Sequence, residues 1–79
     1  MARVLLFGPL QDVAGWRERE VAAPSLLALR AALAALDPAL GEALAGRGVQ
    51  AAVDKALVRG DAPLDAGAEV AFLPPMSGG

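Results

Sequence analysis

The sequence predicts an α+β fold, in which a mixed β-sheet packs against one main helix. Three features support this class: an apolar β run over residues 3–7, leucines at helical spacing over residues 25–36, and a second apolar β run that stops at two prolines. With 79 residues, the chain can bury one core and is expected to form one domain. A composition of 56% hydrophobic and 20% charged residues excludes a disordered chain.

The first two strands are predicted to form a hairpin. Residues 3–7 have the composition of a strand, and the breaker pair Gly8-Pro9 stops it. Residues 9–14 then suit one helical turn with proline at its first position. Residues 16–21 alternate charges of opposite sign, as a solvated strand does, and we expect them to pair with the first strand.

The main helix is predicted over residues 25–36. Ser25 is a suitable N-cap, and the leucines that follow recur at steps of three and four residues, which places them on one face of a helix. We expect that face to belong to the core: Leu26, Leu29, Leu33 and Leu36. The pair Asp37-Pro38 ends this helix and begins a short second helix that closes at Gly46.

The second half of the chain is predicted to supply the remaining strands. Residues 49–53 form a third strand, Asp54-Lys55 a turn, residues 56–58 a short fourth strand, and residues 69–73 the last one. One long helix between a hairpin and further strands is typical of the β-grasp, or ubiquitin-like, arrangement. The alternative is a ferredoxin-like fold, but residues 59–68 do not supply the second helix that it requires.

The residues that are missing restrict the possible function. The chain has no Cys and no His, so it cannot build a thiol nucleophile, an imidazole base or a Cys/His metal site. Hydroxyl groups come only from Ser25 and Ser77, and neither has an evident base. The chain is therefore not expected to be an enzyme on its own. Its most plausible reactive group is the C-terminal carboxyl group.

The charge and the chain ends argue against several partners. The net charge is −2 and the basic residues are scattered, so we expect no nucleic-acid ligand. No apolar run approaches the roughly 18 residues of a membrane span. The apolar stretch at the N-terminus is too short for a secretion signal, so the cytoplasm is the expected location.

The last six residues have the character of a tether. We expect residues 1–73 to form the β-grasp domain and residues 74–79 to form a flexible tail. Pro74-Pro75 prevents further sheet pairing and stiffens the backbone, whereas Gly78-Gly79 lacks Cβ atoms and can enter a narrow channel. The other interpretation is a frayed end that happens to finish in glycine.

The tail also carries a family resemblance. Residues 72–79, FLPPMSGG, resemble the F-x-P-P-[VM]-[AST]-G-G terminus of the small subunit of molybdopterin synthase. Residues 4–7, 29–31, 51–58 and 63–72 are similar to that family in order and spacing, so the resemblance covers essentially the whole chain. Two departures occur: Gln11-Asp12 stands where the family often has Arg-Glu, and Asp54 stands in place of Asn.

The resemblance implies a ubiquitin-like sulfur carrier that binds no cofactor or metal itself. A ubiquitin-activating-like adenylyltransferase would use ATP to adenylate Gly79, and sulfur from a sulfurtransferase donor would replace AMP. The thiocarboxylate would then enter the catalytic site of the large synthase subunit and give its sulfur to cyclic pyranopterin monophosphate, within a heterotetramer of two small and two large subunits. The tail residues implied to enter that partner are Pro74, Pro75, Met76, Ser77 and Gly78.

Strand parity predicts a docking patch beside the tail. If Arg3 faces water, Leu5 and Phe7 face outward and Val4 and Leu6 face the helix. The same parity turns Ala71 and Leu73 outward in the last strand. The predicted partner-binding patch therefore comprises Phe7, Leu57 and Leu73, with Leu5 and Ala71 between them. The opposite parity would make these residues part of the core.

Lys55 and Trp16 each allow two interpretations, and two alternative functions remain for the whole chain. Lys55, the only lysine, is either an isopeptide acceptor or a solvated charge in a turn. Trp16 is expected to anchor the packing rather than to bind a ligand, and residues 17–20 to be a solvated face. The alternative functions are a sulfur carrier for thiamin or another sulfurated product, and a ubiquitin-like tag conjugated to lysines.

Overall fold

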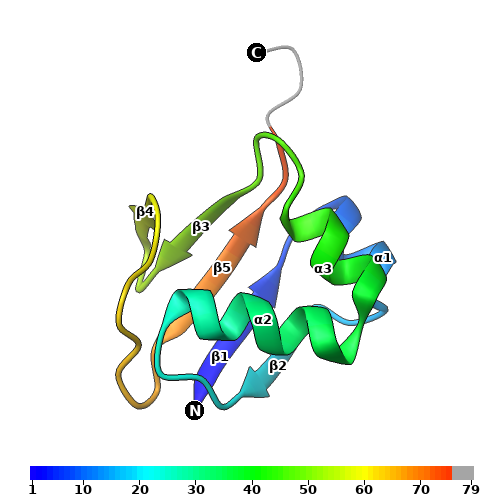
Figure 1. The fold of residues 1–79 in the computed structure, drawn as a ribbon. Helices are drawn as coiled ribbons and strands as arrows, with labels where there is room; N and C mark the ends of the chain where they lie inside the picture. The colour runs from blue at the N-terminus through cyan, green and yellow to red at the C-terminus, as the bar shows by residue number, and fades with distance from the viewer. Residues whose placement is uncertain (76–79) are drawn as a thin grey trace.

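The five strands form one mixed sheet, as the sequence predicts. The computed structural model describes residues 1–75. The elements follow in the order β1 (Ala2–Leu6), α1 (Pro9–Ala14), β2 (Glu18–Val21), α2 (Leu26–Leu36), α3 (Pro38–Leu44), β3 (Gln50–Val53), β4 (Ala56–Val58) and β5 (Glu69–Leu73) (Figure 1). The strand order is β2-β1-β5-β3-β4, in which β1 and β5 are parallel and the other neighbours are antiparallel. The first and last strands are thus neighbours at the centre of the sheet.

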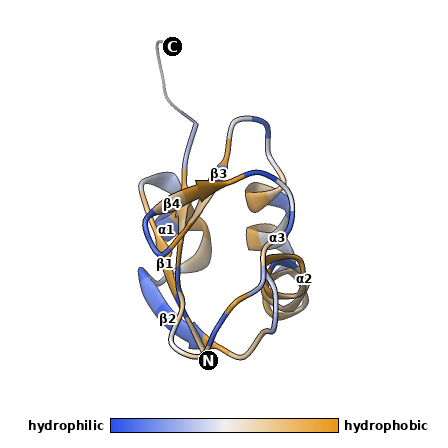
Figure 2. Cartoon of the chain, turned by 90° about the vertical axis from the view of Figure 1, so that its left-hand side faces the viewer, coloured by the Kyte–Doolittle hydropathy of each residue, from blue (hydrophilic) through white to orange (hydrophobic). Residues whose placement is uncertain are grey.

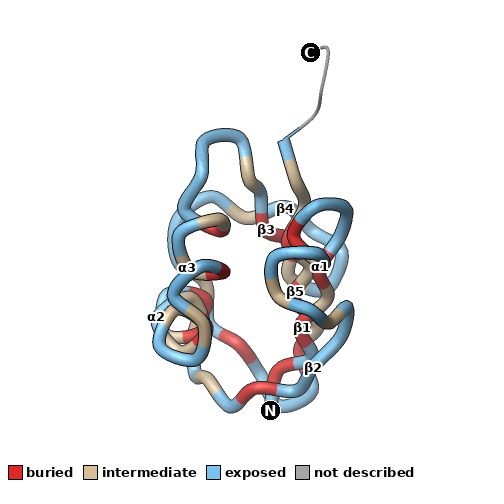
Figure 3. Tube along the Cα trace, turned by 90° about the vertical axis from the view of Figure 1, so that its right-hand side faces the viewer, coloured by how far each residue is buried: buried red, intermediate tan, exposed pale blue. Residues whose placement is uncertain are grey.

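The helices α2 and α3 lie over one face of this sheet, and the core fills the space between them (Figures 1 and 2). The largest fully buried side chain is Phe72 of β5. Around it pack Val4, Leu6 and Val70 from the central strands, Leu26, Leu29 and Leu33 from α2, and Leu40 and Leu44 from α3. Burying each of these larger side chains stabilises the fold by about 1.5–3 kcal/mol. Figure 3 shows these buried segments facing the interior between sheet and helices.

Side-chain caps fix the ends of the two main helices. The Ser25 hydroxyl accepts a hydrogen bond from the Ala28 amide at 3.1 Å and begins α2, as predicted. The Asp37 carboxylate accepts from the amides of Ala39 at 3.1 Å and Leu40 at 3.2 Å, so it ends α2 and begins α3. These bonds satisfy amide groups that have no partner inside the helix.

One predicted core residue is exposed. Leu36 has 57% of its surface exposed, whereas the other three leucines of the α2 stripe are fully buried. The reason is the turn at Asp37, where the chain enters α3. Leu40 of α3 is then buried over this end of the core, and Leu36, the last residue of α2, remains at the rim of a cavity.

Two predicted strands are shorter than expected, and the long connection is irregular. The second strand begins at Glu18 rather than at Trp16, and the third begins at Gln50 rather than at Val49. Residues 59–68 contain no helix, which confirms that the ferredoxin-like alternative does not apply. This connection is attached to the start of α2, because the Leu26 amide donates to the Ala62 carbonyl at 2.8 Å.

Candidate functional site

The helices α2 and α3 leave one face of the sheet uncovered (Figure 2), and the strand pairing places a row of apolar residues on that face. Leu5 of β1 is paired with Ala71 of β5, Ala71 with Ala52 of β3, and Ala52 with Leu57 of β4. Directly paired residues of neighbouring strands point to the same side of a sheet. These four side chains therefore form one row across the outer face.

A second row lies closer to the end of β5. Leu6 is paired with Phe72, so Phe7 follows beside Leu73, and Leu73 is paired with Gln50 on its other side. Phe7 is 42% exposed and Leu57 63% exposed, while Leu73 is half-buried. The two rows together define the outer patch: Leu5, Phe7, Ala52, Leu57, Ala71 and Leu73.

The predicted parity of the central strands is confirmed. Val4 and Leu6 are buried against the helices, while Leu5 is half-buried and Phe7 is exposed on the outer face. Ala52 was not predicted to belong to the patch; it is buried yet lies outside the core cluster. The sequence did contain the information needed to place Ala52 on this face, because the predicted turn at Asp54-Lys55 pairs Ala52 with Leu57. The role of the patch in binding a partner stays a prediction.

A hollow of about 280 Å³ lies beside Phe7. Gln11 and Arg17 line it together with residues of β1 and Glu18. The Gln11 side-chain amide donates to the Leu6 carbonyl at 2.9 Å, so this side chain is held at the end of β1. A neutral amide that is hydrogen-bonded to the end of β1 therefore stands where the family that the sequence resembles often has an arginine.

Charged residues limit the outer patch at the start of β1 and β5. Arg3 is paired with Glu20 on one side and with Glu69 on the other. Its guanidinium also forms an ion pair with Glu18, with 2.8 Å between Nε and Oε2. The hydrogen bond to Glu18, and then its negative charge, raise the pKa of Arg3 above the ordinary arginine value. The guanidinium is charged at neutral pH in any case, so the pair adds no pH dependence there.

The root of the tail lies at the opposite end of β5 from these charges. Pro74 is half-buried and Pro75 is exposed directly after the last strand. The predicted site residues Met76, Ser77, Gly78 and Gly79 lie outside the described residues, so their role stays a prediction. The outer patch and the tail root are therefore adjacent, because Leu73 belongs to the patch and precedes Pro74.

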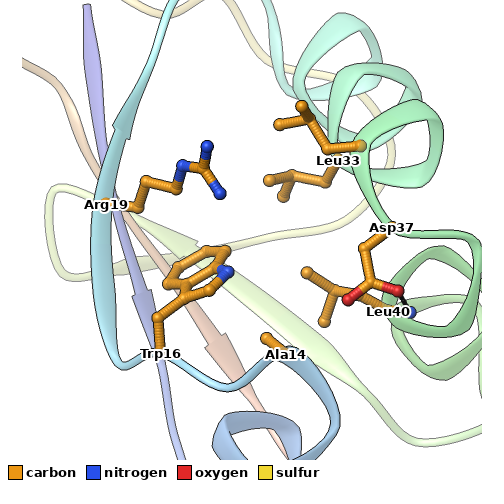
Figure 4. Close-up of a pocket in the computed structure, with 7 residues that line it drawn as sticks. Ala14, Trp16, Arg19, Leu33, Asp37 and Leu40 are labelled. Carbon is orange, nitrogen blue, oxygen red and sulfur yellow. Dashed lines mark hydrogen bonds between the residues drawn. The ribbon is translucent and has the colours of Figure 1, made fainter.

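A separate cavity of about 310 Å³ lies between β2 and the junction of α2 and α3 (Figure 4). Trp16 forms one wall and is half-buried against the core, which confirms that it anchors the packing. The Arg19 guanidinium lies 6.0 Å from the centre of the indole ring, and Asp37 lies across the cavity. The other residues that line the cavity are apolar: Ala14, Leu33, Leu36 and Leu40.

Neither a metal site nor a membrane span is found in the part of the chain that the structure describes. Residues 1–75 contain no cluster of three or more acidic, His or Cys side chains that could hold a metal ion. Among the same residues, no helix has the length and apolar character that crossing a membrane requires.

The fold and the exposed end of the central strand define the class of the protein. A five-stranded mixed sheet in this order, packed on one main helix, is a ubiquitin-like β-grasp fold. The crystal structure of small archaeal modifier protein 1 (SAMP1) from Haloferax volcanii is similar, with a TM-score of 0.86 and 26% identity over 99% of this chain and 98% of that one. The predicted fold class is thus confirmed.

The chain belongs to the ThiS family, whose sequence pattern matches residues 4–79. It is also 42% identical to the molybdopterin synthase sulfur carrier subunit of Escherichia coli, over 81 aligned positions that cover all of both chains. A complex of subunits 1 and 2 of molybdopterin-converting factor from Helicobacter pylori contains a further similar chain, with a TM-score of 0.75, 28% identity and coverage of 99% and 97%. The family resemblance stated from the sequence is confirmed.

Proposed function

We propose that this chain is the sulfur-carrier subunit of a molybdopterin synthase. The observation that supports the proposal most is the full-length relationship at 42% identity to the Escherichia coli sulfur carrier subunit. Over that length the alignment includes the C-terminal residues, which carry the chemistry in this proposal. The absence of Cys and His from the sequence agrees with it, because the reactive group is then the chain's own carboxyl terminus.

The proposed chemistry activates a poor electrophile. Resonance spreads the charge of the Gly79 carboxylate, so a ubiquitin-activating-like adenylyltransferase joins it to the AMP part of ATP and releases pyrophosphate. The sulfurtransferase donor supplies sulfur at the oxidation level of sulfide, and a sulfur lone pair attacks the acyl carbon of the adenylate. The C–S bond forms as the C–O bond to AMP breaks, so AMP leaves and no electrons are exchanged. The resulting thiocarboxylate is the form that donates sulfur to cyclic pyranopterin monophosphate. ATP, donor and precursor are bound by the partners, in the cytoplasm, and this chain is not catalytic on its own.

The outer patch is the proposed contact with the large synthase subunit. A contiguous apolar surface on a small protein commonly marks a binding site. The patch ends at Leu73, so a partner that covers it receives the tail directly beside the contact. The Helicobacter pylori complex supports a two-subunit assembly for this chain as well. We propose the heterotetramer of two small and two large subunits as its final form.

The intact mass of the protein purified from its own host tests the proposal. We expect a fraction of the molecules to carry one sulfur in place of one oxygen, and fragmentation to localise the exchange to Gly79. Deletion of Gly79 should abolish molybdenum-cofactor synthesis, whereas the matched substitution Ser77→Ala, which leaves the terminus in place, should retain it. A Gly79 deletion that still supports cofactor synthesis would refute the proposal.

A second candidate function is the covalent modification of other proteins. The observation that favours it is the similarity to small archaeal modifier protein 1. In that case Gly79 would form isopeptide bonds with lysines. Tagged protein would then accumulate in covalent adducts of higher mass in a cell extract and would never carry sulfur, whereas a sulfur carrier would be recovered mainly as the free chain.

A further inference from the structure

We propose that Gly8 and Gly48 are positioning residues that fix the direction in which the chain leaves the domain after β5. We call them the exit glycines. The inference rests on the proposed function, because the direction of the tail matters only if the tail delivers a reactive end to a partner.

The sheet register brings both glycines to the tail root. Leu6 is paired with Phe72 along the parallel strands β1 and β5, so two residues later Gly8 lies beside Pro74. Gln50 is paired with Leu73 along the antiparallel strands β3 and β5, so two residues earlier Gly48 lies beside Pro75. The two prolines therefore continue β5 between the ends of both neighbouring strands.

At both positions a Cβ atom would crowd a proline ring, which would have to shift by a few tenths of an ångström. A Cβ atom built on Gly8 would lie 3.1 Å from Cγ of Pro74, and one built on Gly48 would lie 3.0 Å from Cβ of Pro75. Real Cβ atoms rarely approach other carbon atoms so closely. Both glycines also have a positive φ, +58° for Gly8 and +85° for Gly48, a backbone conformation that residues with a Cβ atom rarely adopt.

Hydrogen bonds hold the first glycine loop against the end of β1 and close the second loop into a turn. At the first loop, the Gln11 side chain donates to the Leu6 carbonyl at 2.9 Å, and the Gln11 amide donates to the Gly8 carbonyl at 3.1 Å. At the second loop, the Val49 amide donates to the Gly46 carbonyl at 3.3 Å. Pro74 and Pro75 each pack on one of these hydrogen-bonded loops, which restricts the directions that their backbone can take.

The side chain of Arg30 links β5 to the end of α3, from which the loop that contains Gly48 begins. Its guanidinium lies 5.2 Å from the centre of the Phe72 ring and donates to the Leu44 carbonyl at 3.3 Å. Leu44 ends α3, four residues before Gly48, and Phe72 lies two residues before Pro74. The root of the tail and the root of the loop are thus held by the same side chain.

The first test measures direction without any partner. Because the chain has no cysteine, the substitution Ser77→Cys allows one spin label in the tail. The label broadens amide signals of the domain that lie near it. We expect Gly8→Ala and Gly48→Ala to change which amides are broadened. The controls are Gly60→Ala and Gly67→Ala, which also place a Cβ atom on a residue with positive φ, +81° and +79°, but have nothing within 4 Å of the new Cβ atom. These should keep the original pattern.

The second test measures sulfur transfer from the thiocarboxylated chain to precursor on the large subunit. We expect Gly8→Ala and Gly48→Ala to lower the rate at saturating large subunit by at least about tenfold, because misplacing a reacting group by an ångström is costly. The half-saturating concentration should stay close to that of the parent. The additional substitution Pro74→Ala removes the Cγ atom that the Cβ of Gly8→Ala meets, so the double variant should recover part of the rate.

The outcomes separate this inference from the proposed function. If the parent chain never transfers sulfur, the proposed function fails, and the spin-label patterns alone decide on the exit glycines. If the parent transfers sulfur and all four glycine variants match one another in rate and in label pattern, the positioning role is overturned. A loss of rate in the controls equal to that in Gly8→Ala would also overturn it, since strain alone would then explain the effect.

Discussion

Lys55 is a single residue held in a backbone conformation that suits glycine. The turn between β3 and β4 has positive φ at both central residues, 48° at Asp54 and 72° at Lys55. Such turns match the twist of a hairpin and favour Asn or Asp followed by Gly. At Asp54 a hydrogen bond offsets the cost of the positive φ, because the Asp54 carboxylate accepts from the Glu69 amide at 3.0 Å. The strain therefore falls mainly on Lys55.

We expect Lys55→Gly to raise the free energy of unfolding by about 0.5–1 kcal/mol. The left-handed conformation costs a residue with a Cβ atom about 1–2 kcal/mol, and the greater entropy of glycine in the unfolded chain offsets part of that gain. Urea unfolding measures the difference. Lys55→Ala is the control, since it removes the charge and keeps the Cβ atom. Equal stabilities of the two variants would show that the backbone conformation of Lys55 carries no cost.

The same substitution bears on the role of the only lysine. Lys55 is exposed at the tip of the hairpin. Loss of covalent chains in a Lys55→Gly strain, with adducts to other proteins unchanged, would identify it as an acceptor.

At the scale of elements, the contact between α2 and α3 depends on one glycine. A Cβ atom built on Gly41 of α3 would lie 2.5 Å from Cβ and 2.7 Å from Cα of Ala34 in α2. The two helices can approach this closely only because Gly41 has no side chain. In an exposed helix, replacing glycine by alanine stabilises by about 1 kcal/mol. Here overpacking opposes that gain.

We therefore expect Gly41→Ala to lower the free energy of unfolding by about 1–3 kcal/mol, the usual cost of inserting an atom into a packed contact. Thermal or urea unfolding measures the loss. The double variant with Ala34→Gly removes the nearer of the two atoms and should recover part of the stability. If Gly41→Ala alone proves stabilising, the close approach of the helices is wrong.

Local patterns predicted the elements well because each is marked within a few residues. Ser25 and Asp37 cap helices by accepting hydrogen bonds from amides two to three residues away. The pair Gly8-Pro9 follows shortly after the last residue of β1 and ends that strand. Contacts between segments that are distant in the sequence have no comparable local sequence pattern that would predict them. The exposure of Leu36 depends on how α3 folds back, and the contacts of Gly8 and Gly48 with the prolines depend on pairing across the sheet. The outer patch was predictable because strand alternation is itself a local rule.

At the scale of the whole molecule, the two faces of the sheet differ in what they leave exposed. One face is covered by helices, and the other carries the outer patch beside the tail root. We expect Phe7→Glu and Leu73→Glu each to weaken binding of the large synthase subunit by more than about 2 kcal/mol, the range of central interface residues. A charge placed in an apolar contact loses its hydration without gaining a partner. Titration calorimetry with the purified large subunit measures the change.

Two exposed leucines elsewhere provide the matched controls for this prediction. Leu27 is 65% exposed on α2, and Leu36 is 57% exposed at the end of the same helix, away from the outer patch. Leu27→Glu and Leu36→Glu introduce the same charge and should leave the affinity within about 0.5 kcal/mol of the parent. All four variants should unfold cooperatively, because none removes a fully buried side chain. If the helix variants weaken binding as much as Phe7→Glu does, the partner does not dock on the outer patch, and the adjacency of patch and tail has no part in sulfur delivery.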